Sequence, residues 1–345
     1  MRLRPAPCMK MPIIPITEPT QQPPRWQTLL SQAITDPVEL LHELGLPGAL
    51  LPAAVRAGRS FRLRVPRGFV ARMHRQDPRD PLLRQVLPLG EELHDVAGYS
   101  SDPLQELNAM PAPGLLHKYR GRVLLTTTGA CAVHCRYCFR RHYPYAEANP
   151  NREQQQILDY LRRHTEINEV ILSGGDPLTL SDTRLRQLVE TLETIPHLQR
   201  LRIHSRVPVV LPERVDNELL AWLQITRLQT VMVIHSNHAN EIDAAVRDAM
   251  SRLQTTGISL LNQSVLLRGV NDRADVLAAL SERLIAAGVL PYYLHQLDPV
   301  QGAAHFSVSD KTAKELVKQL ITELPGYLVP RLVREQAGQP AKTPL

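Results

Sequence analysis

Three closely spaced cysteines are the residues of this 345-residue sequence most clearly suited to chemistry. They form a C-x3-C-x2-C motif that consists of Cys131, Cys135 and Cys138. Three thiolates on one short loop can bind three irons of a four-iron, four-sulfur (4Fe-4S) cluster, whose full set of protein ligands is normally four cysteines. The fourth iron is then open to another ligand. We expect the remaining cysteine, Cys8, to take no part, because a fourth thiolate would close that open site.

The same motif is also compatible with zinc. Either His134 or His142 could complete a Cys3His site, and the basic residues around the motif would suit a nucleic acid. The spacing by itself therefore leaves two alternatives, an iron–sulfur cluster and a zinc-dependent RNA-binding module. The position of the motif in the expected fold helps to decide between them.

Short apolar runs rich in β-branched residues recur in the second part of the chain, at intervals of roughly 30 residues after the first. They cover residues 123–127, 170–173, 201–205, 230–235, 259–266 and 292–296. Amphipathic segments lie between them, at 182–194, 241–255 and 275–287, and Gly257 and Gly288 are placed as helix C-caps. This alternation predicts an α/β fold with a parallel sheet, here a partial (β/α)6 barrel.

The carboxyl ends of parallel strands meet at one rim, where the active sites of such folds lie. The cysteine motif follows the first expected strand, and a Gly174-Gly175-Asp176 turn follows the second. Two glycines at a strand end can expose backbone to a ligand ammonium, although an ordinary strand-to-helix turn has the same composition. A zinc knuckle does not need a place at the end of a first strand, and the position of the motif therefore favours the iron–sulfur cluster.

The motif and this turn resemble those of the radical S-adenosylmethionine (SAM) superfamily. The resemblance implies that SAM chelates the open iron and that one-electron reduction of its sulfonium releases a 5′-deoxyadenosyl radical. It also implies that Tyr137 packs near the adenine, that the glycine turn receives the amino group, and that Arg206 and Gln263 serve the carboxylate end. The last two residues could instead be rim residues whose partners lie within the protein.

Longer stretches are similar to the lysine 2,3-aminomutase family, over about residues 100–345. They include Pro113-Gly-Leu-Leu-His-Lys-Tyr119, Leu172-Ser-Gly-Gly-Asp176, Ser205-Arg-Val-Pro-Val-Val-Leu-Pro212 and Asn262-Gln-Ser-Val-Leu-Leu-Arg-Gly-Val-Asn-Asp272. Members of this family move an amino group between neighbouring carbons, which requires a π system through which the nitrogen can bridge. Pyridoxal 5′-phosphate (PLP) provides it and is held by a lysine between turnovers.

The resemblance assigns PLP to residues at both ends of the matching region. Lys342 matches the Schiff-base lysine of the family, and Arg122 matches an arginine that binds the phosphate. Lys118 and Tyr119 lie close to Arg122 in the sequence and could assist it. Without the resemblance, each of these residues would be an ordinary surface side chain.

The resemblance also assigns substrate contacts. Arg140 matches the residue that binds the substrate carboxylate, while Asp298 and Glu335 match two acids that bind the ε-ammonium of lysine. Two acids favour a cationic side chain over that of glutamate, because a second carboxylate would be repelled. Glu335 departs from the family, where the second acid is typically Asp.

Within the family, the chain most resembles a short bacterial branch, on residues 80–86, 135–142 and 300–306. The branch implies conversion of L-lysine to (R)-β-lysine, an electron-donor protein, and a partner ligase that attaches the product to elongation factor P. A cysteine-bearing zinc tail, present in longer aminomutases, is missing before the chain ends at Leu345. A radical aminomutase that acts on another amino acid is the alternative.

The composition of the chain constrains its function less than the motifs do. Forty Lys and Arg residues against 34 acids give a net charge of +6, too small a surplus to indicate a nucleic-acid partner. Prolines interrupt the N-terminal apolar residues, and we expect a cytoplasmic protein without a signal peptide or a membrane partner. The expected parts are a proline-rich arm (1–25), a helical region (26–115), a radical SAM partial barrel (116–300) and a C-terminal closing segment (301–345) with the pyridoxal lysine.

Overall fold

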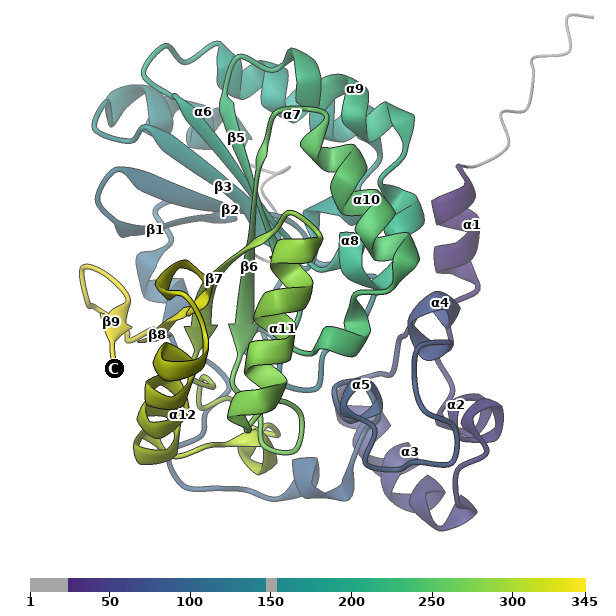
Figure 1. The fold of residues 1–345 in the computed structure, drawn as a ribbon. Helices are drawn as coiled ribbons and strands as arrows, with labels where there is room; N and C mark the ends of the chain where they lie inside the picture. The colour runs from purple at the N-terminus through teal and green to yellow at the C-terminus, as the bar shows by residue number, and fades with distance from the viewer. Residues whose placement is uncertain (1–23, 147–153) are drawn as a thin grey trace, which may run out of the picture.

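One sheet organises the residues that the structure describes, 24–146 and 154–345 of a computed structural model (Figure 1). Its nine strands lie side by side in chain order, from β1 at one edge to β9 at the other. They are β1 (Leu115–Tyr119), β2 (Arg122–Thr128), β3 (Glu169–Gly174), β4 (Arg200–Ser205), β5 (Gln229–His235), β6 (Ser259–Val265), β7 (Leu290–His295), β8 (Arg331–Arg334) and β9 (Thr343–Pro344). Cys8 and nearly all of the expected proline-rich arm lie outside the described residues.

Seven neighbouring strands, β2 to β8, are parallel, and the two edge strands β1 and β9 are antiparallel to them. Strands β2 to β7 coincide with the six apolar runs of the sequence, so the expected α/β fold with a partial barrel is confirmed. The register brings polar residues level at the carboxyl ends. Thr126 of β2 lies opposite Ser173 of β3, and His235 of β5 lies opposite Gln263 of β6.

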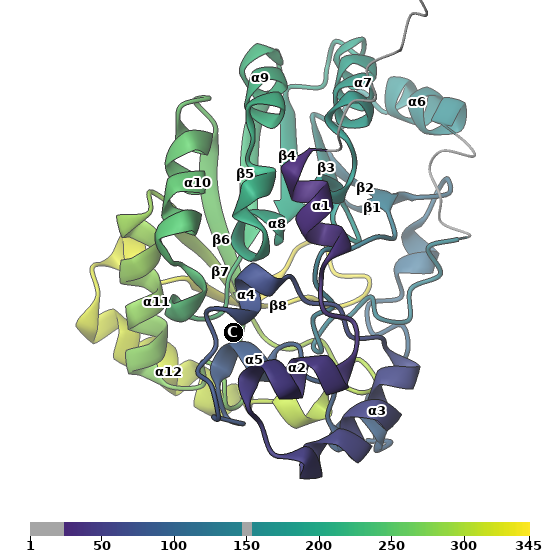
Figure 2. The same ribbon diagram turned by 90° about the vertical axis from the view of Figure 1, so that its right-hand side faces the viewer.

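Helices cover the outer face of the curved sheet (Figures 1 and 2). They are α6 (Gln154–Arg163), α7 (Asp182–Glu193), α8 (Val207–Val210), α9 (Asn217–Ile225), α10 (Ala244–Gln254), α11 (Ala274–Ala286) and α12 (Asp310–Glu323). In α7, Leu185, Val189 and Leu192 recur at helical spacing and are buried against the sheet. Gly257 and Gly288, the expected C-caps, adopt left-handed φ angles just beyond α10 and α11. Every helix of the described residues is too short or too polar to cross a lipid bilayer.

The expected helix at 241–255 begins three residues late. Asp243 is the N-cap residue of α10, since its side chain accepts a hydrogen bond from the backbone N–H of Val246. Glu241 belongs instead to a 3-10 turn, Ala239–Glu241, and is completely buried. Its carboxylate turns back toward the end of β5, where it becomes part of the site described below.

The C-terminal segment joins the same sheet. After α12, β8 adds a seventh parallel strand, and β9 folds back on it with Thr343 opposite Arg334. The sequence did not predict β8, because its four residues alternate poorly: only Leu332 and Val333, at its centre, are buried. The segment places Lys342 immediately before β9 and beside Glu335, which directly follows β8.

The N-terminal region is helical, as expected, and packs beneath the strands (Figure 2). Its helices are α1 (Arg25–Ser31), α2 (Pro37–Leu44), α3 (Leu51–Ser60), α4 (Arg67–Val70) and α5 (Pro81–Arg84). Trp26 and Phe69 belong to one hydrophobic core with Val207 and the barrel strands. The N-terminal helices and the barrel thus share one interior.

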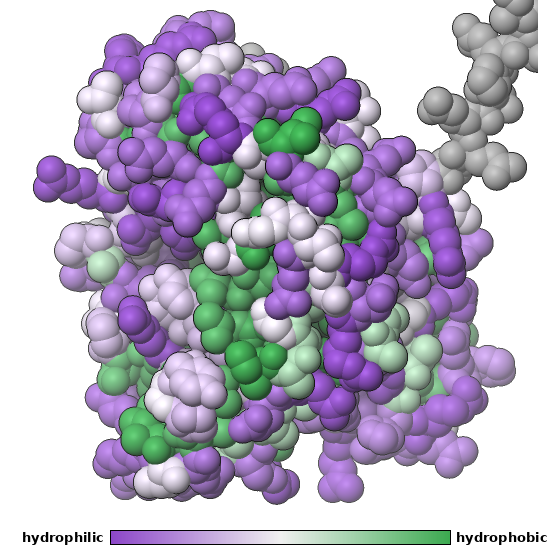
Figure 3. Space-filling model, turned by 45° about the horizontal axis from the view of Figure 1, so that its top comes forward, coloured by the Kyte–Doolittle hydropathy of each residue, from purple (hydrophilic) through white to green (hydrophobic). Residues whose placement is uncertain are grey.

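Hydrophilic residues cover much of the face shown in Figure 3, with an apolar strip through its middle.

Two glycines bring the ends of β2 and β3 together. Gly174 has a φ of +119°, and a Cβ placed there would lie 2.6 Å from the carbonyl oxygen of Thr128. A Cβ on Gly175 would lie 2.3 Å from the oxygen of Ala130, just before the cysteine motif. The N–H of Gly175 donates to Thr128 at 2.7 Å and that of Asp176 to Ala130 at 2.8 Å. The glycine turn therefore fixes the start of the cysteine loop.

We expect Gly175→Ala to destabilise the protein, because the new methyl group forces the two loops apart. Overpacking of this kind typically costs about 1–3 kcal/mol, which thermal unfolding of the cofactor-free protein will detect. The matched control is Gly68→Ala in α4, where a Cβ meets nothing within 4 Å. Equal unfolding temperatures for the two variants would contradict the close packing of the loops.

Candidate functional site

The residues to which the sequence assigns chemistry line one cavity of about 510 Å³ on one face of the sheet, from the start of β2 to the carboxyl ends of the strands. They are Lys118, Tyr119, Arg122, Cys131, Cys135, Tyr137, Cys138, Arg140, Gly174, Gly175, Asp176, Arg206, Gln263, Asp298, Glu335 and Lys342. The cavity brings residues of the first strands together with the last residues of the chain. It is therefore the candidate active site.

The three cysteines at one end of the cavity are free thiols. Burial, together with the nearby Cys135, raises the pKa of the Cys138 thiol to about 11. Burial and Cys138 likewise raise the pKa of Cys131. Binding of a metal cluster relieves this cost, because thiolates are stabilised by the metal. Among the described residues, no three His, Cys, Asp or Glu side chains converge as ligands of a single ion do, whereas each thiolate of a 4Fe-4S cluster bonds a different iron. The donor set fits such a cluster.

The cysteine loop is anchored on the N-terminal region. The backbone N–H of Arg136 donates to Gln85, and its buried guanidinium pairs with Glu92. His134, one of the two candidate zinc ligands, has its Nδ1 2.9 Å from the carbonyl oxygen of Arg62. The Nε2 of His142, the other candidate, lies 3.3 Å from a backbone oxygen of residue 301 and is outside the cavity lining. Both imidazoles are thus tied to other segments.

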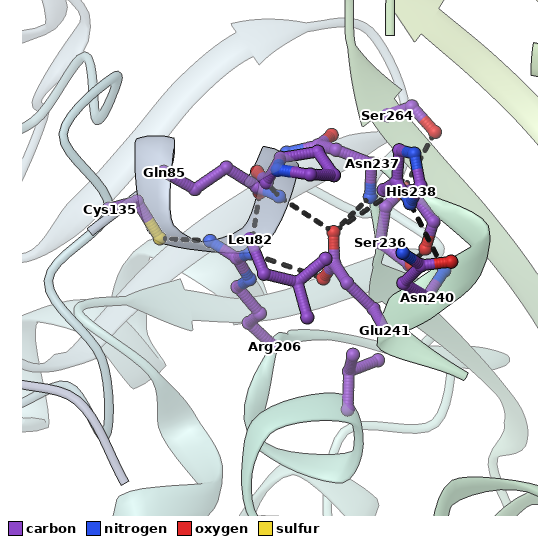
Figure 4. A network of polar contacts seen from close by, with 12 residues as sticks. Leu82, Gln85, Cys135, Arg206, Ser236, Asn237, His238, Asn240, Glu241 and Ser264 are labelled. Carbon is purple, nitrogen blue, oxygen red and sulfur yellow. Dashed lines mark hydrogen bonds and ion pairs between the residues drawn. The ribbon is translucent and has the colours of Figure 1, made fainter. Parts of the chain in front are cut away.

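Two residues expected to contact SAM already have protein partners. The guanidinium of Arg206 donates to the Sγ of Cys135 at 2.8 Å and pairs with Glu241 at 3.1 Å (Figure 4). The Asp176 carboxylate accepts from the Ser205 hydroxyl and from the N–H of Arg206, both at 2.7 Å. Burial raises the pKa of Asp176 to about 6, against the opposing effect of these hydrogen bonds. Asp176 therefore positions the end of β4.

The other expected SAM contacts also have neighbours in the cavity. The Tyr145 hydroxyl donates to the carbonyl oxygen of Gly174 at 2.9 Å. Gln263 lies with its Nε2 2.8 Å from the Nε2 of His235. The ring of Tyr137 stands edge-on to that of Phe306, with centroids 6.3 Å apart. These contacts hold the side chains in place along the cavity wall.

Charges of alternating sign form a chain along the other side of the cavity. Its members, in order of contact, are Arg140, Glu106, Lys118, Glu335 and Lys342. Arg140 pairs with Glu106 through two nitrogens, at 2.6 and 2.8 Å, and Lys118 lies 2.8 Å from both Glu106 and Glu335. Because each charge has a partner of opposite sign, Arg140 and Glu106 can be buried and the other three charges partly buried.

The two acids expected to bind the substrate ammonium differ in their surroundings. Burial opposes ionisation of Glu335, but Lys342 and Lys118 outweigh it and hold the pKa of this carboxyl well below its usual range. Burial, with Glu335 as a second cause, raises the pKa of Asp298 to about 7. Asp298 is thus the acid of the pair that a further cation would ionise.

The residues expected to bind PLP lie around aromatic rings. The guanidinium of Arg122 lies over the ring of Tyr119, 4.5 Å from its centroid. The Nζ of Lys342 lies 5.9 Å from the centroid of Tyr293. A lysine amine, a half-buried arginine and aromatic walls suit an aromatic aldehyde that carries a phosphate. The residues present therefore fit PLP.

The sequence analysis missed several cavity residues. Glu106 comes from a proline- and aspartate-rich stretch that has no strand or helix pattern, although it is buried. Three histidines of the cavity lie at the carboxyl ends of strands: His235 and His295 are the last residues of β5 and β7, and His204 is the last but one of β4. Burial lowers the pKa of His235 and that of His295 to about 3, so both are neutral. Their place at strand ends did put these histidines at the rim of the expected barrel, although no role was assigned to them, whereas no sequence pattern pointed to Glu106.

Two of these histidines strengthen the case for a bound ligand. Within the part of the chain that the structure describes, the Nε2 atoms of His204 and His295 are buried without a hydrogen-bond partner. Buried polar atoms normally have a partner. Both side chains line the cavity, and a ligand there can supply the missing contacts.

Comparison with known proteins agrees with this picture. Residues 125–280, which include the cysteine motif and strands β3 to β6, match the Radical SAM superfamily. The chain is 50% identical over 334 residues to a Haemophilus influenzae protein named L-lysine 2,3-aminomutase, with 96% of this chain and 99% of that one covered. It is 51% identical over 335 residues to an Escherichia coli protein of the same name, with 96% and 97% covered. A Clostridium subterminale protein of that name is 37% identical over 290 residues, with 83% and 69% covered.

The raised pKa of Asp298 predicts a pH-dependent stability. Between about pH 4 and pH 7 the folded protein keeps a proton on Asp298 that the unfolded chain has released, so this part of the free energy of unfolding falls as the pH rises. We expect Asp298→Asn to become steadily more stable than the original protein over this window, with a constant difference above it. Denaturant unfolding of the cofactor-free proteins at a series of pH values measures this. The control is Asp248→Asn, at an exposed residue, whose difference in free energy of unfolding from the original protein should not vary with pH. If the difference for Asp298→Asn is equally constant, the raised pKa of Asp298 is refuted.

Proposed function

Since the chain belongs to the lysine 2,3-aminomutase family of radical SAM enzymes, we propose that it converts L-lysine into (R)-β-lysine. It is an isomerase, and its superfamily implies a 4Fe-4S cluster and SAM. PLP, held by Lys342, is part of the proposal. When bound, the cluster and SAM supply the radical that removes a hydrogen atom from the substrate, and PLP supplies the π system through which the amino group migrates.

The contact between Glu335 and Lys342 is the observation that supports lysine as the substrate. Here a carboxylate already binds a primary ammonium on a flexible alkyl chain, as it would bind the substrate's ε-ammonium. When Lys342 holds the cofactor, its place beside Glu335 becomes available to such a group. Asp298, the neighbouring acid, can then ionise and add a second negative charge.

The opposite end of the substrate needs a cation, and Arg140 supports that role. Glu106 holds the Arg140 guanidinium through two nitrogens, and among the described residues the third nitrogen donates only to the Ser173 hydroxyl, at 3.2 Å. A substrate carboxylate can take the place of this weak contact without breaking the ion pair. Arg140 would thus orient the amino acid at one end while Glu335 and Asp298 hold the other, and the spacing of the two ends selects the length of the substrate.

The remaining residues hold and isolate the reacting groups. We assign the cluster to the three cysteines, and the phosphate of PLP to Arg122 with help from Lys118 and Tyr119. Apolar side chains that line the cavity, among them Ile171, Val265 and Leu297, limit the access of water. Exclusion of water matters in radical chemistry, because it suppresses side reactions of the reactive species.

The expected partners follow from the proposed reaction. We propose that an electron-donor protein reduces the cluster and that a ligase passes β-lysine on to elongation factor P, in the cytoplasm. The division of the chain into an arm, a helical region, a barrel and a closing segment remains part of the proposal. The alternative is a radical aminomutase for another amino acid; glutamate fits poorly, because its side chain would face Glu335 and Asp298.

Direct assay tests the proposal. The protein, reconstituted anaerobically with iron, sulfide, SAM and PLP, is expected to form (R)-β-lysine from L-lysine on addition of a reductant. Chiral chromatography of the product gives both its identity and its configuration. Glutamate, alanine and ornithine serve as competing substrates. A fully loaded protein that leaves lysine unchanged, or turns over one of these faster, would overturn the proposal.

We expect Lys342→Ala to keep iron and sulfide at the original stoichiometry but to lose covalently attached PLP, because the amine of Lys118, which also lines the cavity, is paired with both Glu106 and Glu335. Borohydride reduction followed by peptide mass spectrometry measures the attachment. The control is Lys314→Ala, an exposed lysine of α12, which should retain modification at position 342. Modification of Lys118 in the original protein would show that the cofactor lysine is misassigned.

A further inference from the structure

A buried polar network lies behind the cysteine motif and joins three parts of the fold (Figure 4). Its members are Gln85, Cys135, Tyr137, Arg206, Asn237 and Glu241. The exposed fraction is 4% for Arg206 and 0% for both Glu241 and Gln85. Water therefore does not compete for these contacts, and the network connects the N-terminal region with the ends of β4 and β5.

Arg206 has a partner for each of its terminal nitrogens. One nitrogen donates to the Sγ of Cys135 at 2.8 Å and to the Tyr137 hydroxyl at 2.7 Å. The other donates to Gln85 at 2.7 Å and to Glu241 at 3.1 Å. The planar guanidinium thus faces a cysteine sulfur on one side and a carboxylate on the other, which leaves both terminal nitrogens occupied.

Glu241 is held in place independently of Arg206. One carboxylate oxygen accepts from the backbone N–H groups of Asn237 and His238, at 2.9 and 3.1 Å, and from Gln85 at 3.0 Å. Only the second oxygen bonds to Arg206. The carboxylate therefore acts as a fixed point against which the arginine is oriented.

We propose that Arg206, oriented by Glu241 and Gln85, is a positioning residue that donates to the Cys135 thiolate and raises the reduction potential of the cluster. Its terminal nitrogens are not free for the SAM carboxylate, because they are used within the protein; of its N–H groups, only the buried Nε–H has no partner among the described residues. This inference rests on the proposed function only in requiring that the cysteines hold a 4Fe-4S cluster.

The physical basis is the charge of the reduced state. One-electron reduction adds a negative charge to the cluster, and some of that charge is shared with the ligand sulfurs. A buried cationic donor beside Cys135 stabilises the reduced state more than the oxidised state. The effect is strong where water is excluded, as it is around Arg206. Hydrogen bonds to cluster sulfurs are one of the means by which proteins set such potentials.

The test is an EPR-monitored redox titration of the reconstituted protein without SAM, PLP or lysine. The variant is Arg206→Gln with Glu241→Gln, which removes both charges and leaves no buried charge unpaired. At the midpoint potential of the original protein, we expect the ratio of reduced to oxidised cluster in the double variant to be about tenfold lower. This corresponds to a midpoint potential ~59 mV lower for a one-electron step. The matched control, Arg214→Gln with Asp182→Asn, neutralises a buried pair elsewhere in the protein and should leave the ratio unchanged.

Each further result has a definite meaning. An unchanged midpoint in the Arg206 variant, or an equal shift in the control, overturns the inference, and so does a variant that loses only SAM affinity. If the double variant assembles no cluster, Arg206→Lys replaces it. Arg206→Lys keeps the positive charge but cannot contact both Cys135 and Glu241. It should lower the midpoint potential of the cluster by less than the double variant does, and an unchanged potential overturns the inference. If the original protein itself binds no iron and sulfide, the proposed function fails instead.

Discussion

Charges that are buried or partly buried in the cavity must neutralise one another, and this requirement decides which segments of the chain have to meet. Glu106 precedes the sheet, Lys118 lies on its first strand, and Glu335 and Lys342 lie at its last. None of these groups can be buried alone without a large loss of solvation. The cavity therefore requires β1, the barrel and the C-terminal segment to close around it.

Much of the fold follows from the sequence because its central strands bury apolar residues, along the whole length of β3 and at alternate positions of β4 and β6. Such strands appear as apolar runs, and their regular spacing identified β2 to β7. The edge strands β1 and β9 and the short β8 have too few buried residues for such a pattern. The cysteines and Lys342 could be predicted from residue type and the family resemblance. Glu106 could not be predicted, since its burial depends wholly on contacts distant in sequence.

Residue types also predict chemistry better than they predict partners. Arginine at a strand end suits an anion, and the sequence analysis assigned Arg206 to a ligand on that basis. In the structure its neighbours are Cys135 and Glu241, and Glu241 itself was expected within a helix. A side chain with several donors can bind ligand or protein equally well, and only the folded arrangement determines which partner is nearer.

The short hairpin of β8 and β9 has a consequence for how this active site can diverge. Glu335 follows β8 directly and Lys342 precedes β9 directly, so both depend on the same two residue pairs, Val333 with Pro344 and Arg334 with Thr343. A sequence change that alters this hairpin moves the lysine and the acid together. If these two residues have the roles proposed above, substrate choice and cofactor attachment are inherited as one unit, and a descendant with a new substrate preference has to change at another proposed contact, Asp298 or Arg140.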